Sequence, residues 1–172
     1  MRFFQVMPML LALASGPVFA EDAKTKVLFI AGHPSHAPGE HEHRAGCMLL
    51  AKALEEGLPS VDAEVSWYGW PRDASVFEGV SAVVMYCDGG GGHYVNRQLE
   101  FVQGLADKGV GIVCIHYGVE VPKGGPGDKF LQWIGGYFET DWSVNPHWDA
   151  NFATLPEHPI TRGVSPFEIN DE

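Results

Sequence analysis

The chain has 172 residues, of which 45% are hydrophobic and 19% are charged, and this composition is typical of one folded domain. A second domain of ordinary size does not fit beside it, so any active site lies within one core or at an oligomer interface. The formal net charge is −11. Nucleic acids and anionic membrane surfaces bind clustered Lys and Arg, so neither is expected as a partner. Eight His residues, by contrast, supply many potential ligands.

Residues 1–20 have the three-part pattern of a secretory signal. A positive start precedes an apolar stretch over 6–14, and the small residues Val18 and Ala20 come before a cut. The apolar stretch is shorter than the ~20 residues that span a bilayer. The alternatives are a buried N-terminal helix and a membrane-held end. We expect cleavage after Ala20 and a periplasmic or secreted domain over 21–172, without membrane contact after cleavage.

The remaining chain alternates short apolar runs with segments of helical periodicity. Continuous apolar runs indicate strands buried on both faces, and apolar residues three to four positions apart indicate helices. The expected strands cover 26–31, 63–68, 81–87 and 110–116, and the expected helices cover 41–57, 95–106 and 128–138. Residues 152–168 leave room for a small strand pair. This order predicts an α/β fold with a doubly wound, mostly parallel sheet, whose ligands bind beyond the carboxyl ends of the strands.

The three cysteines show no metal-binding or redox spacing. Cys47 lies in the apolar stripe of the first helix, and Cys114 lies within an apolar run, so both are predicted to be buried thiols. A disulfide between Cys87 and Cys114 is the alternative, if their strands are neighbours.

The loop after the first strand, residues 32–44, contains four His and two Glu. Neutral imidazole and carboxylate groups bind divalent ions such as Zn²⁺ or Mn²⁺, and we take His36 and His41 as candidate metal ligands. The spacing does not match the helical H-E-x-x-H pattern. A solvated loop in which Glu40 and Glu42 cap the next helix is an equal alternative.

The loop after the third strand contains four consecutive glycines, Gly89, Gly90, Gly91 and Gly92. Without side chains, their backbone N–H groups can approach a substrate oxyanion. The Lys of a phosphate loop is missing, so no nucleotide is expected. Two neighbours complete the site: Asp88 as ligand or general base, and His93 as metal ligand. A flexible connection with ordinary turn glycines is the alternative.

The turn after the fourth strand places His116 at the strand tip, with a glycine two positions later. This order is similar to a nucleophile elbow, and Glu120 is close enough to orient or charge the imidazole. The alternative is a histidine that is hydrogen-bonded in the core. His147 and His158 are weaker candidates, and His158 is expected to start a turn.

Six motifs are similar to those of one known family. They are G-H-P-S-H-x-x-G-E-H-E from Gly32, C-D-G-G-G-G-H from Cys87, C-I-H-Y-G-V-E-V from Cys114, W-I-G-G-Y-F-E-T from Trp133, and N-P-H-W with H-P-I-T-R-G-V near the end. Over residues 26–170 the chain resembles the ThuA-like (trehalose utilisation) domains. These are a branch of the class I glutamine amidotransferase-like superfamily, and the resemblance implies a flavodoxin-like sheet.

The resemblance also carries expectations about chemistry. The amidotransferases place a Cys at the elbow, but here His116 occupies that position and Cys114 should point into the sheet. Their later His–Glu pair has no match before the chain ends. The resemblance therefore implies no glutamine hydrolysis, and a domain that is incomplete at its C-terminus. It implies a role in disaccharide or glycoside metabolism, with Tyr117, Trp142 and Trp148 as sugar-stacking surfaces.

Three hypotheses follow. The first is a metal-assisted hydrolase or lyase that acts on a sugar derivative. Its expected catalytic residues are His116, Glu120 and Asp88, its metal ligands His36, His41 and His93, and its substrate contacts Gly89–Gly92, Tyr117, Trp142, His147 and Trp148. The second is a non-catalytic carbohydrate-binding module. The third is an interaction subunit completed by a partner's strand, and a homo-oligomer is compatible with all three.

Overall fold

The computed structural model describes residues 24–142, 144 and 146–171. The predicted signal peptide lies outside the described residues. The α-helices are α1 (His43–Gly57), α2 (Leu99–Asp107) and α3 (Gly125–Trp133). The strands are β1 (Thr25–Ala31), β2 (Val61–Ser66), β3 (Val80–Tyr86), β4 (Gly111–Ile115), β5 (Glu120–Val121), β6 (Phe138–Glu139), β7 (Trp148–Phe152) and β8 (Phe167–Asp171). No helix in the described ranges has the length and apolar character needed to cross a membrane.

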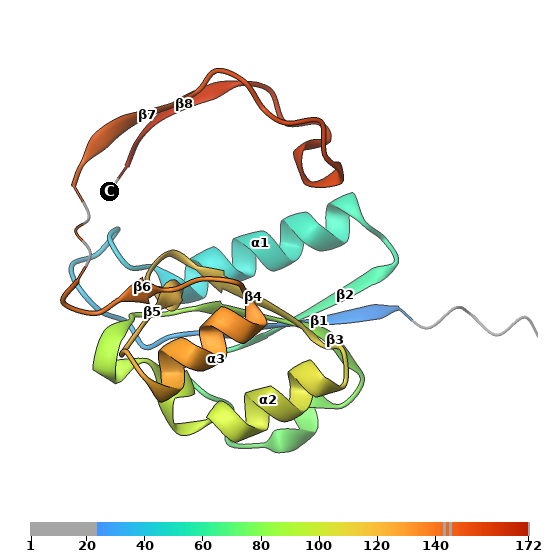
Figure 1. Ribbon diagram of the computed structural model, residues 1–172. Helices are drawn as coiled ribbons and strands as arrows, with labels where there is room; N and C mark the ends of the chain where they lie inside the picture. The colour runs from blue at the N-terminus through green and yellow to red at the C-terminus, as the bar shows by residue number, and fades with distance from the viewer. Residues whose placement is uncertain (1–23, 143, 145, 172) are drawn as a thin grey trace, which may run out of the picture.

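The main sheet is parallel throughout, in the order β2-β1-β3-β4. Helix α1 covers one face, and α2 and α3 cover the other (Figure 1). This arrangement confirms the predicted α/β doubly wound sheet and is consistent with a flavodoxin-like fold. Strand order reverses between β1 and β3, so the crevice beyond their carboxyl ends is the place where such sheets bind ligands.

Side chains of β1 alternate between two cores, one on each face of the sheet. Leu28 and Ile30 pack on the face covered by α2 and α3, whereas Val27, Phe29 and Ala31 pack on the α1 face. Successive strand residues point to opposite faces. A strand between two helical layers is therefore apolar throughout, which explains its continuous apolar run.

The last predicted helix differs from α3 in its bounds. We expected a helix over 128–138, but α3 covers Gly125–Trp133. Pro126 occupies the first turn, where its missing N–H is tolerated. The helix ends at Trp133, because Gly135 takes a left-handed backbone with φ 80°.

The expected strand pair is an antiparallel hairpin of β7 and β8, which begins four residues earlier and ends three residues later than the predicted range 152–168. It arches over α1 on the side away from the sheet (Figure 1). Two much shorter strands, β5 and β6, form a separate parallel pair.

All three cysteines are free, so the disulfide alternative is wrong. Cys47 and Cys87 are buried, and Cys114 is partly buried beside the core of the α2 and α3 face. Burial raises the pKa of Cys47 to about 11 and the pKa of both Cys87 and Cys114 to about 12. All three are therefore neutral thiols near pH 7, and none is a ready nucleophile.

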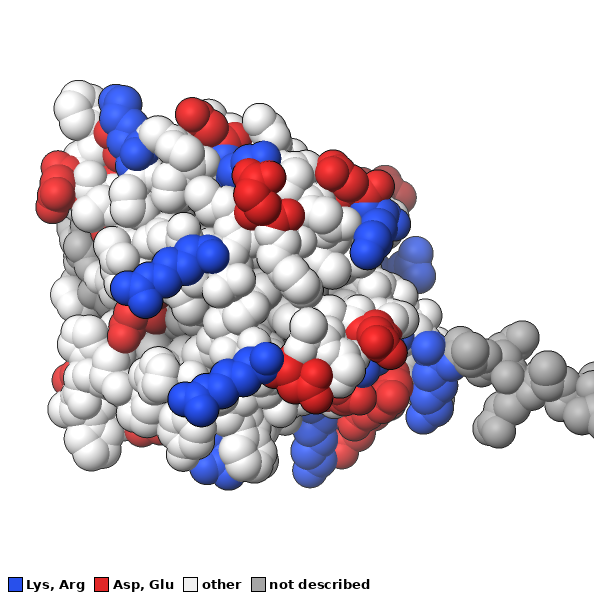
Figure 2. Space-filling model, turned by 90° about the horizontal axis from the view of Figure 1, so that it is seen from below, with Lys and Arg blue, Asp and Glu red and all other residues white. Residues whose placement is uncertain are grey.

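The face that carries α2 and α3 shows Lys and Arg interspersed with Asp and Glu (Figure 2). One contact there joins the two helices: Lys129 donates a hydrogen bond to Oε1 of Gln103, 2.9 Å away. The charges of this face are thus of mixed sign, without a continuous basic patch among its described residues.

Candidate functional site

Two loops at the carboxyl edge of the sheet bring two imidazoles and a carboxylate together. The candidate ligand atoms of His36, His41 and Asp88 all lie within 4.8 Å of one another. The ring centroids of His36 and His41 are 3.9 Å apart. His41 is buried and His36 is exposed. This group, the His/Asp cluster below, could hold a metal ion, and both of its histidines were predicted as ligands.

Hydrogen bonds organise the His/Asp cluster around one carboxylate oxygen. Oδ1 of Asp88 accepts from Nδ1 of His41 and from Oγ of Ser35, each at 2.9 Å. Partial burial raises the pKa of Asp88, but these hydrogen bonds and the charges of His43 and His41 outweigh burial and lower the pKa below its ordinary value. The carboxylate is therefore ionised near pH 7, as a metal ligand must be.

Two histidines of the site have left-handed backbones. His36 has φ 60° and His116 has φ 53°, a conformation that costs roughly 1–2 kcal/mol for residues other than glycine. His116 follows the last residue of β4, and the chain then passes close to β3. A Cβ on Gly118 would lie 2.8 Å from the carbonyl oxygen of Met85. The glycine thus allows a sharp turn that places His116 at the strand end.

Two adjoining cavities meet at the His/Asp cluster and share His36, His41 and Tyr117. The larger has a volume of about 600 Å³. It is lined by His36, Glu40, His41, Tyr86, His116, Tyr117, His147 and Asp171. The smaller, of about 410 Å³, is lined by His36, His41, Asp88, Gly89, Tyr117, Glu120, Phe138 and Asp141. Both volumes suit a small-molecule ligand.

The rings of His116 and Tyr117 pack against the ring of His41 and against each other. The ring centroid of His41 lies 5.3 Å from that of His116 and 5.6 Å from that of Tyr117, both with edge-to-face geometry. The His116 and Tyr117 rings are 4.5 Å apart. The structure therefore brings His116 beside the His/Asp cluster, on the larger cavity.

The glycine loop packs directly against Glu120. A Cβ on Gly89 would collide with the Glu120 side chain and would lie 2.6 Å from the carbonyl oxygen of Tyr117. Gly90 has φ 65°, and its missing Cβ faces Oε1 of Glu120 at 3.7 Å. These two glycines thus allow a close approach of the loop to the segment after β4. Of the four glycines predicted to contact substrate, Gly89 lines the smaller cavity, whereas Gly90, Gly91 and Gly92 line neither cavity.

His93 does not join the metal-ligand group. Its ring is 2% exposed, and both nitrogens are already engaged. Nδ1 accepts a hydrogen bond from the Val95 N–H at 3.1 Å, and Nε2–H donates to the Gly118 carbonyl at 3.1 Å. Burial lowers the pKa of His93 to about 4, so the ring is neutral. No lone pair remains for a metal, and His93 holds the glycine loop to the turn after β4.

The alternative interpretation of the first loop, in which two glutamates cap the helix, also differs from the structure. Glu42 is the N-cap residue of α1, but its side chain makes no capping hydrogen bond. Its Oε1 accepts instead from the Gly39 N–H at 2.9 Å, and Oε2 of Glu40 accepts from the Ala37 N–H at 3.0 Å. Both carboxylates therefore brace the loop that carries His36 and His41.

Only some of the residues predicted to contact a sugar line the two cavities. Tyr117 lines both cavities, and His147 lines the larger one. Trp142 and Trp148 are 79% and 58% exposed, and neither lines these cavities.

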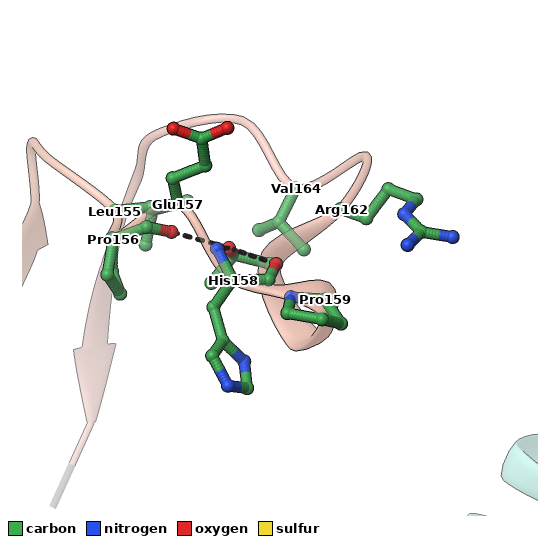
Figure 3. Close-up of a pocket in the computed structure, with 8 residues that line it drawn as sticks. Leu155, Pro156, Glu157, His158, Pro159, Arg162 and Val164 are labelled. Carbon is green, nitrogen blue, oxygen red and sulfur yellow. Dashed lines mark hydrogen bonds between the residues drawn. The ribbon is translucent and has the colours of Figure 1, made fainter.

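A separate hollow lies in the loop between β7 and β8 (Figure 3). There His158 starts a single turn of 3-10 helix, as predicted from the sequence. Its Nδ1 accepts from the Ile160 N–H at 3.2 Å, and its own N–H donates to Oγ1 of Thr161 at 3.2 Å. This histidine is thus a cap of a local turn, and none of the residues of the His/Asp cluster line this hollow.

Ser35, His43, Tyr86 and Asp171 are among the site residues that were missed from the sequence. Ser35 and His43 lie in the histidine-rich loop, where their position could have suggested them. Tyr86 is the last residue of β3, and the strand-end rule points to it. Asp171 reaches the larger cavity from β8, and no motif indicates it.

No protein-family model, curated protein sequence or solved structure matches this chain. The fold defines a flavodoxin-like α/β domain, and the site defines a candidate metal centre at its switch point. Function must therefore be argued from the site itself.

Proposed function

We propose that this protein is a metal-assisted hydrolase or lyase that acts on a sugar derivative. The observation that carries the proposal is the convergence of His36, His41 and Asp88 within 4.8 Å, with all three lining the smaller cavity. A bound divalent ion supplies Lewis acidity at such a site. Imidazole and carboxylate donors fit this role, and the low pKa of Asp88 keeps one ligand anionic.

The chain's own side chains would divide the work as follows. Asp88 and His41 hold the ion, and Asp88 thus acts as ligand rather than as base. The ring centroid of His116 lies 5.3 Å from that of His41, and both residues line the larger cavity. There His116 can exchange a proton with a substrate hydroxyl. Glu120 lines the smaller cavity beside Asp88 and is the second acid–base candidate.

A polyhydroxylated substrate fits the lining of both cavities. Carboxylates and imidazoles can pair with sugar hydroxyls, and Tyr117 offers a ring for a sugar face. The resemblance to ThuA-like domains, with its link to disaccharide and glycoside metabolism, supports the same substrate class. The signal-like N-terminus supports an exported protein.

Metal binding is the first test. Titration calorimetry of the full chain with Zn²⁺ and with Mn²⁺ is expected to show one site, and a chelator is expected to lower the thermal stability of the loaded protein. His41→Ala is expected to lose binding. His158→Ala is the matched control, because it removes an imidazole from the remote turn. Absence of binding, or equal loss in both variants, contradicts the proposal.

Catalysis is the second test. The loaded protein is incubated with disaccharides and glycosides, including trehalose, and products are separated by chromatography. We expect turnover that falls at least ~100-fold in His116→Ala, since general acid–base catalysis contributes ~10²–10⁴-fold. Metal binding should be unchanged in that variant. Turnover of no sugar by a metal-loaded protein would refute this function.

A non-catalytic carbohydrate-binding module is the second candidate. The exposed indoles of Trp142 and Trp148 favour it, because solvent-facing rings can stack on sugars without a cavity. It predicts sugar affinity that survives His116→Ala and falls in Trp148→Ala. The enzyme hypothesis predicts instead that turnover falls in His116→Ala and survives in Trp148→Ala.

A further inference from the structure

A further imidazole faces the His/Asp cluster from the first residue of α1. His43 is 1% exposed, and its Nδ1 lies 2.9 Å from the carbonyl oxygen of His33. A carbonyl only accepts, so Nδ1 carries a proton, and in the neutral form of the ring the lone pair is on Nε2. Nε2 has no hydrogen-bond partner among the described residues, and it lies 3.7 Å from Oδ1 of Asp88.

The His43 ring is held firmly in this orientation. It meets the Tyr86 ring edge to face, with centroids 4.9 Å apart. A Cβ on Gly32 would lie 3.1 Å from Nδ1 of His43, so only glycine leaves the ring this much room. A buried acceptor without a partner costs about 1–3 kcal/mol. A hydrogen-bond donor or a metal ion bound to Nε2 would remove that penalty.

We propose that Nε2 of His43 is a fixed metal ligand, together with His41 and Asp88. This inference rests on the proposed metal centre. Tetrahedral zinc ligands with bonds of ~2.0–2.2 Å are separated by about 3.3–3.6 Å, close to the 3.7 Å between Nε2 and Oδ1. An Nδ1–H donated to a backbone carbonyl is also the arrangement that orients a histidine ligand in metal sites.

The same proposal gives His36 a different role. His36 belongs to the group of ligand atoms within 4.8 Å and His43 does not, so shared binding of one ion by His43, His41 and Asp88 would require these side chains to move closer together. His36 is exposed on a loop, and it takes the remaining position, where water or substrate can replace it. Catalytic zinc sites keep one such open position. A set of imidazoles with one carboxylate favours Zn²⁺ over Mn²⁺, which prefers oxygen ligands.

The direct test is NMR of the wild-type full chain with ¹⁵N-labelled histidine, titrated with Zn²⁺. We expect the Nε2 resonance of His43 to shift on binding while Nδ1 keeps its proton. If Zn²⁺ binds and shifts His36 and His41 but leaves Nε2 of His43 unchanged, this inference is wrong and the metal centre stands. If no histidine responds, both the inference and the metal centre fail.

A variant series gives the second measurement. His43→Asn retains an amide donor near Nδ1 and removes Nε2, and His36→Asn makes the same change at the exposed ring. We expect His43→Asn to weaken Zn²⁺ binding by at least ~10-fold more than His36→Asn, in the range known for residues that support metal sites. His33→Asn, an exposed histidine of the same loop, should bind as wild type. A larger loss in His36→Asn overturns the proposal. If His43→Asn does not fold, the NMR titration decides.

Discussion

Gly89 offers a sharp test of why the loop after β3 contains four glycines. In Gly89→Ala the new Cβ would collide with the Glu120 side chain and lie 2.6 Å from the carbonyl oxygen of Tyr117. The nearest atom of Glu120 is its Cβ, which side-chain rotation does not move, and the carbonyl belongs to the backbone of the turn after β4. Overpacking of this kind costs typically ~1–3 kcal/mol. Gly91→Ala is the matched control, because nothing lies within 4 Å of its Cβ position.

Urea unfolding followed by fluorescence measures both variants. We expect Gly89→Ala to lower the free energy of unfolding by ~1–3 kcal/mol with an unchanged m-value, which corresponds to roughly 2–12 °C in Tm. Gly91→Ala should be neutral, or more stable by up to about 1 kcal/mol, because alanine restricts the unfolded chain. Equal effects in the two variants would show that close approach to Glu120 is not the reason for the glycine at position 89. Binding of a substrate oxyanion by the loop would then be the favoured explanation.

Three further predictions concern the site's charge, the core and the thiols. Asp88→Asn should lower stability near pH 7 by under about 1 kcal/mol, since the carboxylate is 43% exposed and screened by solvent. Because the folded pKa of Asp88 is lowered, its contribution is present above pH 3.8 and lost as the pH falls through the lowered pKa, so wild type and variant should converge in acid denaturation curves below that pH. A difference that persists in acid refutes this cause. Phe130→Ala removes a fully buried ring and should cost ~3–5 kcal/mol in urea unfolding, whereas a cost below ~1 kcal/mol contradicts its burial. Iodoacetamide at pH 7.5 should leave Cys47, Cys87 and Cys114 unmodified by mass spectrometry until urea unfolds the chain; rapid alkylation of the native protein contradicts their raised pKa values.

Periodicity in the sequence was sufficient to predict the sheet and its helices. A strand buried on both faces must be apolar at every position, and a helix on a sheet must repeat every three to four residues. These patterns are local, so they predicted β1, β3, β4 and α1 within about two residues. The bounds of α3 were predicted less well, because a left-handed glycine and a proline in the first turn set its ends.

The strand-end rule also located the site from sequence alone. The rule predicted a ligand site at the three loops that supply His36, Asp88 and His116. The structure brings these loops together beside β1 and β3. A residue's place beyond a parallel strand follows from chain order, which the sequence contains.

The sequence by itself thus determined the α/β architecture and the edge of the sheet where chemistry belongs. Only the tertiary structure decided which histidines can act there, because a ring's lone pair depends on partners far along the chain. His93 is engaged on both nitrogens, one by the Gly118 carbonyl 25 residues away, so it cannot bind a metal. His43, which no motif favoured, is buried with Nε2 3.7 Å from Oδ1 of Asp88 and without a hydrogen-bond partner in the part of the chain that the structure describes. The loop before His93 is rich in glycine and the loop before His43 is rich in histidine, but what decides their roles is hydrogen bonds that form only when distant segments pack together.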